Sequence, residues 1–399
     1  MSRSWQLQTL MLTSVTFGAL SAVAGAAQAQ LKQTDLVSDI PGLATLMDTN
    51  LVNTWGVSAM PGGSPFWISN QGTGTTSLFS VTGSTGVAPV NLPFGTNAVN
   101  IPPPVTGTPP FPGPTGQVAN RTSAFKIGSA ASAKPALFIF ANLNGSISAW
   151  NLSNAPLSAA TVEVPALSAV YTGLAITGPS NPTPMLYAAN GTTGAINVFN
   201  GSFGASSVSG GFVDSGLPSG LVPFNVEDIG GKVYVAYAPA GHANQMDAAA
   251  GEGAVAVFDE NGKLLDSLVT GGPLAAPWGM AIAPANFGQF AGDLLVGNFS
   301  SVDSEINAFD ATTGAFMATI HVDPGKGNTP GGLWDLLFGT GGPNGDPRTL
   351  YFTDGINGEK DGLFGALTVP EPSTWAMMLL GFGGLALFAS RRRGSVALG

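Results

Sequence analysis

The sequence predicts an all-β protein whose body is a six-bladed β-propeller, and three observations lead to this prediction. A short motif recurs six times along the 399-residue chain, roughly every 55 residues. Each copy is followed by short runs in which apolar and β-branched residues alternate, as is typical of strands. Gly (56 residues) and Pro (30 residues) are abundant, so we expect many turns and little helix.

The recurring motif consists of an aromatic residue or Thr, a small or polar residue, and then an apolar run. Its six copies begin at Trp55, Thr115, Thr172, Asn225, Trp278 and Trp334, and the Asn225 copy departs furthest from the pattern. Six similar units at a near-constant spacing indicate a repeat architecture. Because apolar sheets cannot remain single-sided in water, we expect each unit to pack on the next around an axis.

Each unit is expected to form four antiparallel strands. A second apolar run follows the motif, for example at residues 137–142 or 294–298, and a third run follows a turn, for example at residues 195–199 or 254–259. A further turn such as Asn261-Gly262 then begins a fourth strand. A parallel β-helix would need shorter repeats, whereas a pair of β-sandwiches is the alternative to a propeller.

The last unit is one strand short, because Leu367 runs directly into a C-terminal segment of different character. An incomplete final blade leaves an open sheet edge, which another segment of the chain has to cover. We therefore expect a strand within residues 31–51 to complete this blade. The Pro-rich residues 101–114 are expected to form a long loop without regular structure.

Composition and charge exclude several classes of function. The chain has no Cys, which rules out disulfides, thiolate metal sites and Cys nucleophiles. Asp and Glu number 23 against 13 Lys and Arg, and four of the basic residues lie at the two ends: Arg3, Arg391, Arg392 and Arg393. The body is therefore strongly acidic and would be repelled by phosphate backbones, so we expect no nucleic-acid partner.

Residues 1–29 have the organisation of a signal peptide. Arg3 supplies the positive start, residues 10–24 are apolar apart from Thr and Ser, and Ala27-Gln28-Ala29 is a small-x-small cleavage site. This order predicts export, and the propeller is then expected to span residues 30–368.

Residues 369–399 have a different organisation. The sequence Pro370-Glu371-Pro372 precedes an uncharged apolar stretch of about 17 residues, long enough as a helix to cross a bilayer, and Arg391, Arg392 and Arg393 follow at once. Three Arg residues favour the cytoplasmic side, which places the body outside the inner membrane. We expect this single span to be a transient anchor, with the body in the periplasm, at the cell surface or in the extracellular space.

The order of Pro370-Glu371-Pro372, apolar span and Arg cluster resembles the PEP-CTERM sorting signal. The resemblance implies that an exosortase recognises and cleaves the tail, often in bacteria that build an extracellular polysaccharide matrix. The body also resembles the propeller-like family that commonly precedes such tails and, more loosely, NHL-type propellers. Residues 51–56, 138–150 and 277–310 carry this likeness. It implies a fold and a location, but no particular reaction.

The polar residues that close the second strand of five units are the first candidate site: Asn70, Asn142, Asn190, Asn298 and Asp354. Equivalent positions of a propeller fall on one face, so these side chains could meet near a central funnel. Amide and carboxylate oxygens suit Ca²⁺. The alternative, which we favour, is that each side chain caps its own turn, as Asn often does.

His242 is a weaker candidate, with Asp247 nearby in the loop-like residues 239–253. The only other His is His321, and no spacing of acid and His residues suggests a catalytic triad. Sequence motifs of serine hydrolases, zinc proteases and nucleotide-binding proteins are absent from the chain.

Two hypotheses of function follow. The favoured one is an exported, exosortase-sorted binding or structural module of the cell surface or extracellular matrix, with polysaccharide as one candidate partner and no cofactor. The alternative is a metal-dependent hydrolase or lyase of the six-bladed lactonase or streptogramin-lyase type, with Ca²⁺ as its ion. A mostly amide set of ligands supplies little charge for Lewis-acid catalysis, so the sequence favours a non-enzymatic role without excluding an enzyme.

Overall fold

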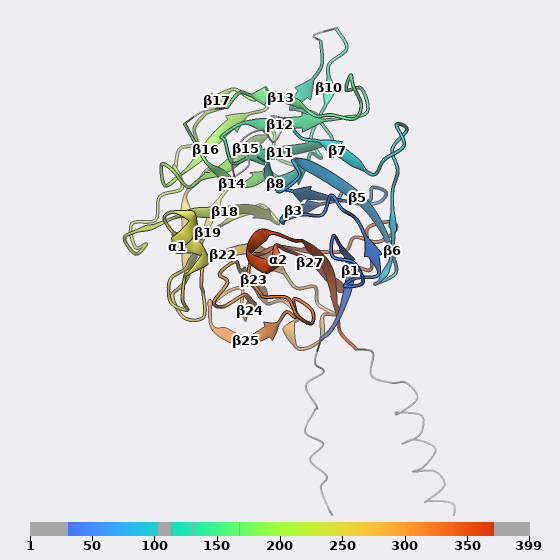
Figure 1. The fold of residues 1–399 in the computed structure, drawn as a ribbon. Helices are drawn as coiled ribbons and strands as arrows, with labels where there is room; N and C mark the ends of the chain where they lie inside the picture. Colours follow the sequence, from blue (N-terminus) through green and yellow to red (C-terminus); the bar gives the residue numbers. More distant parts are fainter. Residues whose placement is uncertain (1–30, 103–112, 130, 167, 371–399) are drawn as a thin grey trace, which may run out of the picture.

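A computed structural model describes residues 31–102, 113–129, 131–166 and 168–370 and shows six antiparallel sheets arranged in a ring (Figure 1). The first strand of each sheet lies against the first strands of the two neighbouring sheets, in the order β3, β8, β14, β18, β22, β26 and back to β3. This closed circuit surrounds a central channel. The predicted six-bladed β-propeller is therefore confirmed, and the alternative of paired sandwiches is wrong.

The first three blades contain residues 54–206. Blade 1 consists of β3 (Thr54–Ser58), β4 (Phe66–Asn70), β5 (Thr75–Thr82) and β6 (Gly86–Pro89), with β7 (Ala98–Asn100) also paired to β5. Blade 2 consists of β8 (Pro114–Ala119), β11 (Phe138–Asn142), β12 (Ile147–Trp150) and β13 (Thr161–Val164), and a separate hairpin joins β9 (Lys126–Ile127) to β10 (Lys134–Pro135). Blade 3 consists of β14 (Tyr171–Ile176), β15 (Met185–Asn190), β16 (Ala195–Asn200) and β17 (Ala205–Ser206).

The other three blades follow in chain order. Blade 4 consists of β18 (Leu221–Ile229), β19 (Lys232–Pro239), β20 (Ala254–Asp259) and β21 (Leu264–Thr270), with helix α1 (His242–Met246) between β19 and β20. Blade 5 consists of β22 (Pro277–Ile282), β23 (Leu294–Asn298), β24 (Glu305–Phe309) and β25 (Phe316–His321), with the 3₁₀ turn η1 (Gly288–Phe290). Blade 6 contains β26 (Leu333–Phe338), β27 (Thr349–Asp354), the short helix α2 (Ile356–Glu359) and β28 (Leu363–Thr368).

The N-terminal segment closes the ring, as the sequence predicts. Strand β1 (Lys32–Ser38) pairs antiparallel with β28, from Lys32 opposite Thr368 to Ser38 opposite Leu363. The two-residue strand β2 (Leu46–Met47) then pairs parallel to β1 at the outer edge of blade 6. Figure 1 shows the blue N-terminal strand beside the red C-terminal blade. The first and last segments of the chain thus share one sheet.

The small residue of the recurring motif has a structural reason. The six motif copies all lie on the innermost strands, where neighbouring blades approach most closely. A Cβ atom on Gly56 would lie 2.8 Å from the carbonyl oxygen of Thr115 in blade 2. A Cβ atom on Gly116 would lie 2.5 Å from the backbone nitrogen of Leu174 in blade 3. Glycine therefore lets adjacent inner strands pack backbone against backbone around the channel.

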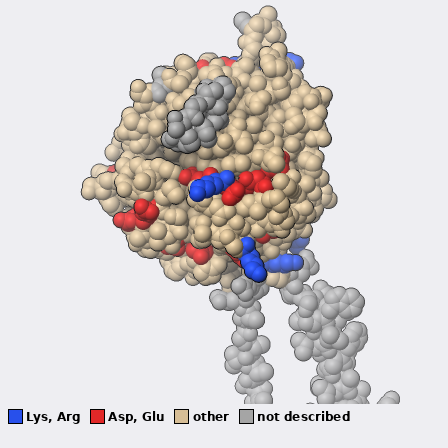
Figure 2. All heavy atoms as spheres, viewed as in Figure 1, with Lys and Arg blue, Asp and Glu red and all other residues tan. Residues whose placement is uncertain are grey.

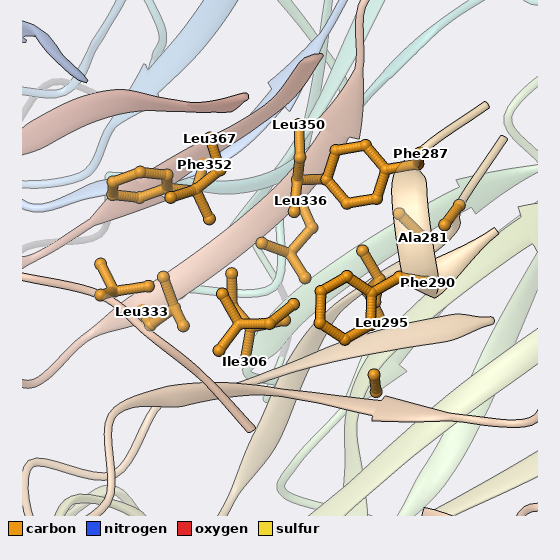
Figure 3. Packing of buried hydrophobic residues seen from close by; sticks show 14 of the residues in the cluster. Ala281, Phe287, Phe290, Leu295, Ile306, Leu333, Leu336, Leu350, Phe352 and Leu367 are labelled. Carbon is orange, nitrogen blue, oxygen red and sulfur yellow. The ribbon is translucent and has the colours of Figure 1, made fainter. Parts of the chain in front are cut away.

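Apolar layers between adjacent blades form the core. Figure 3 shows the layer between blades 5 and 6, where Leu295 and Ile306 of blade 5 meet Leu336 and Phe352 of blade 6. Phe287, in the loop that precedes η1, covers the same layer and is fully buried. Since every blade is buried on both faces in this way, a single unit would not be stable alone.

Several expectations fall on residues that the structure does not describe. The predicted signal peptide (residues 1–29) and the tail beyond residue 370, with Glu371, Pro372, Arg391, Arg392 and Arg393, lie outside the described residues. Most of the predicted Pro-rich loop, residues 103–112, does so too. Within the described part of the chain, no helix has the length and apolar character needed to cross a membrane.

Candidate ligand-binding site in the central channel

An aromatic cluster fills one end of the central channel. Trp55, Trp278 and Trp334 each occupy the second position of an innermost strand, in blades 1, 5 and 6. The rings of Trp55 and Trp334 stack with centroids 3.4 Å apart, and Trp278 meets them edge-on at 6.2 Å and 5.6 Å. Phe224 and Phe299 pack against Trp334 at 5.8 Å and 4.3 Å. Because rings from four blades meet here, the cluster lies on the axis and closes this end of the channel.

The five candidate residues at the ends of second strands lie at this same end of the ring. Asn70 pairs with Thr54, and Asp354 pairs with Leu333, so each lies beside the residue that immediately precedes a Trp of the cluster. Asn142, Asn190 and Asn298 occupy the same register, opposite the first residue of β8, β14 and β22. The part of the axis that these residues surround is thus occupied by aromatic side chains.

The amide groups of this series bond mainly within their own blades. Asn70 donates to the hydroxyls of Thr75 and Ser77, at 3.0 Å and 2.8 Å. Asn190 accepts from the backbone of Thr192 at 3.0 Å, as a turn-capping Asn does. Asn298 accepts from the backbone of Ala275 at 3.0 Å.

Three members of the series nevertheless keep an oxygen without a partner. The Oδ1 atoms of Asn70, Asn142 and Asp354 are buried and accept no hydrogen bond within the described part of the chain. They belong to blades 1, 2 and 6, which are consecutive around the ring. Burial raises the pKa of Asp354 to about 8. Three buried acceptors at one register position are uncommon in a native protein, where such atoms usually have partners.

The other end of the channel contains a cavity of about 790 Å³. Residues from the innermost strands of all six blades contribute to its lining: Val57, Gln117, Leu174, Glu227, Trp278 and Asp335. Trp278 also belongs to the aromatic cluster, so the cluster closes the inner end of the cavity. The result is a blind pocket whose size is typical of small-molecule sites.

Two carboxyl groups are fixed in the walls of this pocket. Asp335 accepts from the backbone nitrogens of Val57 at 2.7 Å and Leu336 at 2.8 Å. Glu227 accepts through Oε1 from the side chain of Asn225 at 3.1 Å and from the backbone of Met280 at 3.3 Å. Asp335 therefore links blade 6 to blade 1 at the channel wall, and Glu227 links blade 4 to blade 5.

Both carboxyl groups have raised pKa values. Burial raises the pKa of Asp335 to about 7, although its two backbone hydrogen bonds act in the opposite direction. Burial also raises the pKa of Glu227 well above its usual range, and the nearby charge of Asp335 raises it further. Burial therefore favours the neutral form of both carboxyl groups relative to an exposed carboxylate.

A second acidic pair lies at the rim of the pocket. Asp228 accepts from the backbone of Gly231 at 3.1 Å, and its other oxygen has no partner in the described structure. Burial and the neighbouring carboxyl of Glu260 raise the pKa of Asp228 to about 7. Glu260 accepts from the backbone of Gly178 at 2.8 Å and from Asn181 at 2.7 Å.

His242 lies away from the pocket, on the face that carries α1 and α2. Its Nε2 atom pairs with Glu359 at 2.6 Å, and this hydrogen bond raises the pKa of His242. Glu359 also accepts from Asn53, whose Oδ1 accepts from the indole of Trp334 at 3.2 Å. Asp247 is exposed at the C-terminal end of α1. Figure 2 shows this face, with acidic side chains near its middle and a basic one among them.

Sequence reasoning did not single out Glu227 and Asp335 as site residues. Both lie within motif strands, and in the strand of Asp335 this residue is the only polar one, so a charged side chain in an apolar run was the available signal there. His242 and Glu359 are 117 residues apart in the sequence, and no sequence pattern indicated that they pair. Among the described residues, no three His, Cys, Asp or Glu side chains gather in an arrangement that could hold a metal ion.

Comparison with known proteins identifies the C-terminal segment. Residues 368–393 match the model of the PEP-CTERM protein-sorting motif. The chain thus carries this motif, and the predicted resemblance is confirmed. The motif implies export, sorting to the surface and processing by an exosortase.

The body has relatives of low identity. Two uncharacterized proteins of Acanthamoeba polyphaga mimivirus are 28% and 27% identical to the chain, over 341 and 342 residues. Each alignment covers 83% of this chain, and they cover 78% and 84% of the two viral proteins.

Two solved structures match the chain at low identity. A glucose dehydrogenase is 13% identical with a TM-score of 0.48, covering 84% of this chain and 98% of its own. A gluconolactonase of Xanthomonas campestris is 15% identical with a TM-score of 0.37, covering 58% of this chain and 82% of its own. Neither likeness bears on chemistry.

Proposed function

We propose that the protein is an exported binding module of the cell surface or extracellular matrix, and that the blind pocket of the central channel is its ligand site. In this proposal the signal peptide directs export, the C-terminal span holds the chain transiently in the inner membrane, and an exosortase cleaves near Pro370, Glu371 and Pro372. Matrix polysaccharide is the first class of partner to test.

One observation carries the proposal: a cavity of about 790 Å³ is walled by all six blades and closed at its inner end by aromatic rings. Such a cavity buries most of a small ligand's surface. Gln117, Glu227 and Asp335 come from the innermost strands, which the closed ring holds rigidly, so this part of the site is formed before a ligand arrives. A purely structural role would not require a cavity with fixed carboxyl groups.

The experiment is a binding screen with a blocked pocket as the control. We expect saccharide fragments of the host's own matrix to raise the melting temperature of the folded body, residues 30–368. The variant Ser180→Trp places a large side chain in the exposed rim of the pocket and should abolish this shift without changing the melting temperature of the free protein. An equal shift in both proteins would place the ligand elsewhere and contradict the proposal.

A second candidate function, ion-dependent hydrolysis, has one observation in its favour. The unpartnered oxygens of Asn70, Asn142 and Asp354 are the type of ligand that Ca²⁺ accepts. On this hypothesis Ca²⁺ raises the melting temperature of the wild type and not that of Asp354→Asn, and lactone turnover depends on the ion. A binding module without an ion at this end should show neither effect.

A further inference from the structure

The ionisable side chains of the pocket are predominantly acidic. Its ionisable lining residues are four acids and one base: Glu227, Asp228, Glu260, Asp335 and Arg121. Asp335 lies deepest in the fold, at 8% exposure, whereas Arg121 is exposed. Burial raises the pKa of three of these acids, and a cation that enters between them would favour their charged forms, since the low-dielectric walls of a cavity strengthen the attraction.

A buried amide in the same pocket also offers an unused acceptor. Gln117 is 6% exposed, and its Nε2 atom donates to the backbone carbonyls of Gly56, at 2.8 Å, and Trp67. These two bonds fix the amide orientation, so the acceptor is Oε1. That atom has no partner in the described part of the chain. A buried acceptor without a donor is unfavourable, and a ligand that supplies a donor would relieve this penalty.

Some carboxyl oxygens of the pocket also accept no hydrogen bond from a described group. The backbone and Asn225 bonds of Glu227 all reach Oε1, and no described group donates to Oε2. Asp228 likewise keeps one unpartnered oxygen. Trp278 also contributes to the lining, and its backbone carbonyl accepts from Asn225 at 3.0 Å, which holds this amide beside Glu227. Each of these features favours the same ligand chemistry.

We propose that the channel pocket recognises a small organic amine, whose ammonium group donates to the carboxyl groups of Glu227 and Asp335 and whose remaining donors reach Gln117. This inference rests on the pocket being the ligand site, as proposed above, and it assigns the ligand's chemical class. An amino sugar of a matrix polysaccharide has this chemistry, because it combines an ammonium group with several hydroxyl donors.

The geometry favours an organic cation over a metal ion. The described residues contain no group of three acidic or His side chains placed to hold a metal, whereas an ammonium group needs only acceptors within hydrogen-bond distance. The cavity volume of about 790 Å³ also suits a molecule of sugar size better than a bare ion.

The test compares two ligands: the disaccharide of glucosamine, which carries ammonium groups, and its N-acetylated counterpart, in which neutral amides replace them. Titration calorimetry on the wild-type body at pH 7.5 should show binding of the amine at least tenfold tighter than that of the acetylated sugar. Glu227→Gln keeps the Oε1 acceptor and removes the charge, so it should weaken binding of the amine at least tenfold. Asp266→Asn removes an exposed carboxyl on the outer strand β21 and should leave binding unchanged.

The outcomes separate this inference from the proposed function. Equal binding of both sugars, unaffected by Glu227→Gln and abolished by Ser180→Trp, would overturn the amine class while the pocket remained the ligand site. Binding that Ser180→Trp does not affect would overturn both proposals. Tighter binding of Ca²⁺ than of the amine, lost in Glu227→Gln, would also overturn the amine class. Melting temperatures of all variants without ligand establish that each one is folded.

Discussion

At Asp354 the burial of a side chain conflicts directly with its charge. This residue ends β27, is 1% exposed, and has an Oδ1 atom without a hydrogen-bond partner among the described residues. Burial raises its pKa from 3.8 to about 8. Between these two pH values the folded protein binds a proton that the unfolded chain has lost. The free energy of unfolding should therefore fall as pH rises from about 4 to about 8.

The variant Asp354→Asn tests this conflict. An Asn side chain has the same shape and no charge, so it should remove this contribution to the pH dependence. We expect similar stability of variant and wild type near pH 4, and a gain on the order of a few kcal/mol for the variant at pH 9. Urea unfolding across this range, in buffer without divalent ions, measures the effect. If the free energy of unfolding falls equally with pH in both proteins, Asp354 is not the source of the pH dependence. Asp266→Asn, which changes an exposed carboxyl group, serves as the control.

Individual residues were predictable from the sequence only where the repeat constrains them. Gly follows the first motif residue in four of the six copies, as after Trp55 and Thr115, and it could be recognised because the backbones of adjacent inner strands come into contact there. The charges of Glu227 and Asp335 could not be assigned a role, because each occurs in one blade and their proximity depends on closure of the ring. The contact of His242 with Glu359 depends on two short helices in loops of unequal length.

At the scale of elements, the fourth strand of blade 6 comes from the other end of the chain. Leu36 on β1 is fully buried in the layer between blades 6 and 1, whereas Met47 on β2 is half exposed. This arrangement makes the N-terminal segment part of the core and not an appendage.

Shortening the side chain of Leu36 should therefore lower the stability of the whole ring. We expect Leu36→Ala to lower the free energy of unfolding by about 2–5 kcal/mol, as for other buried leucines, and Met47→Ala to change it by less than about 0.5 kcal/mol. Deleting residues 31–51 should have a larger effect, because it exposes an unpaired edge of β28. Chemical denaturation measures all three variants. A deletion variant that unfolds at the wild-type denaturant concentration would show that closure by β1 adds nothing to stability.

The elements themselves were largely predictable, because strand period, turn residues and motif spacing agree with one another in every unit. The prediction of a closing N-terminal strand rested on a count of strands and is confirmed by the pairing of β1 with β28. The extra strands β2 and β7, and the hairpin of β9 and β10, were missed. They are three residues long or shorter, so neither alternation nor length distinguishes them from loops.

At the scale of the molecule, the two ends of the propeller meet in one sheet. Lys32 lies opposite Thr368, directly before the segment that matches the sorting motif. The motif implies export and processing by an exosortase. Because the N-terminal strand completes the last blade, we expect the propeller to fold without the tail.

We propose that the tail directs this propeller to the membrane and that an exosortase then cleaves the tail from it. The apolar span should stop in the inner membrane with Arg391, Arg392 and Arg393 inside, so we expect cleavage near Pro370-Glu371-Pro372 on the outer side. Intact-mass measurement of the protein, purified from a host with its exosortase and from the same host without it, tests this directly. We predict a shorter chain that ends near residues 370–372 in the first host, and the full tail in the second. The same tail-bearing mass in both hosts would contradict the account.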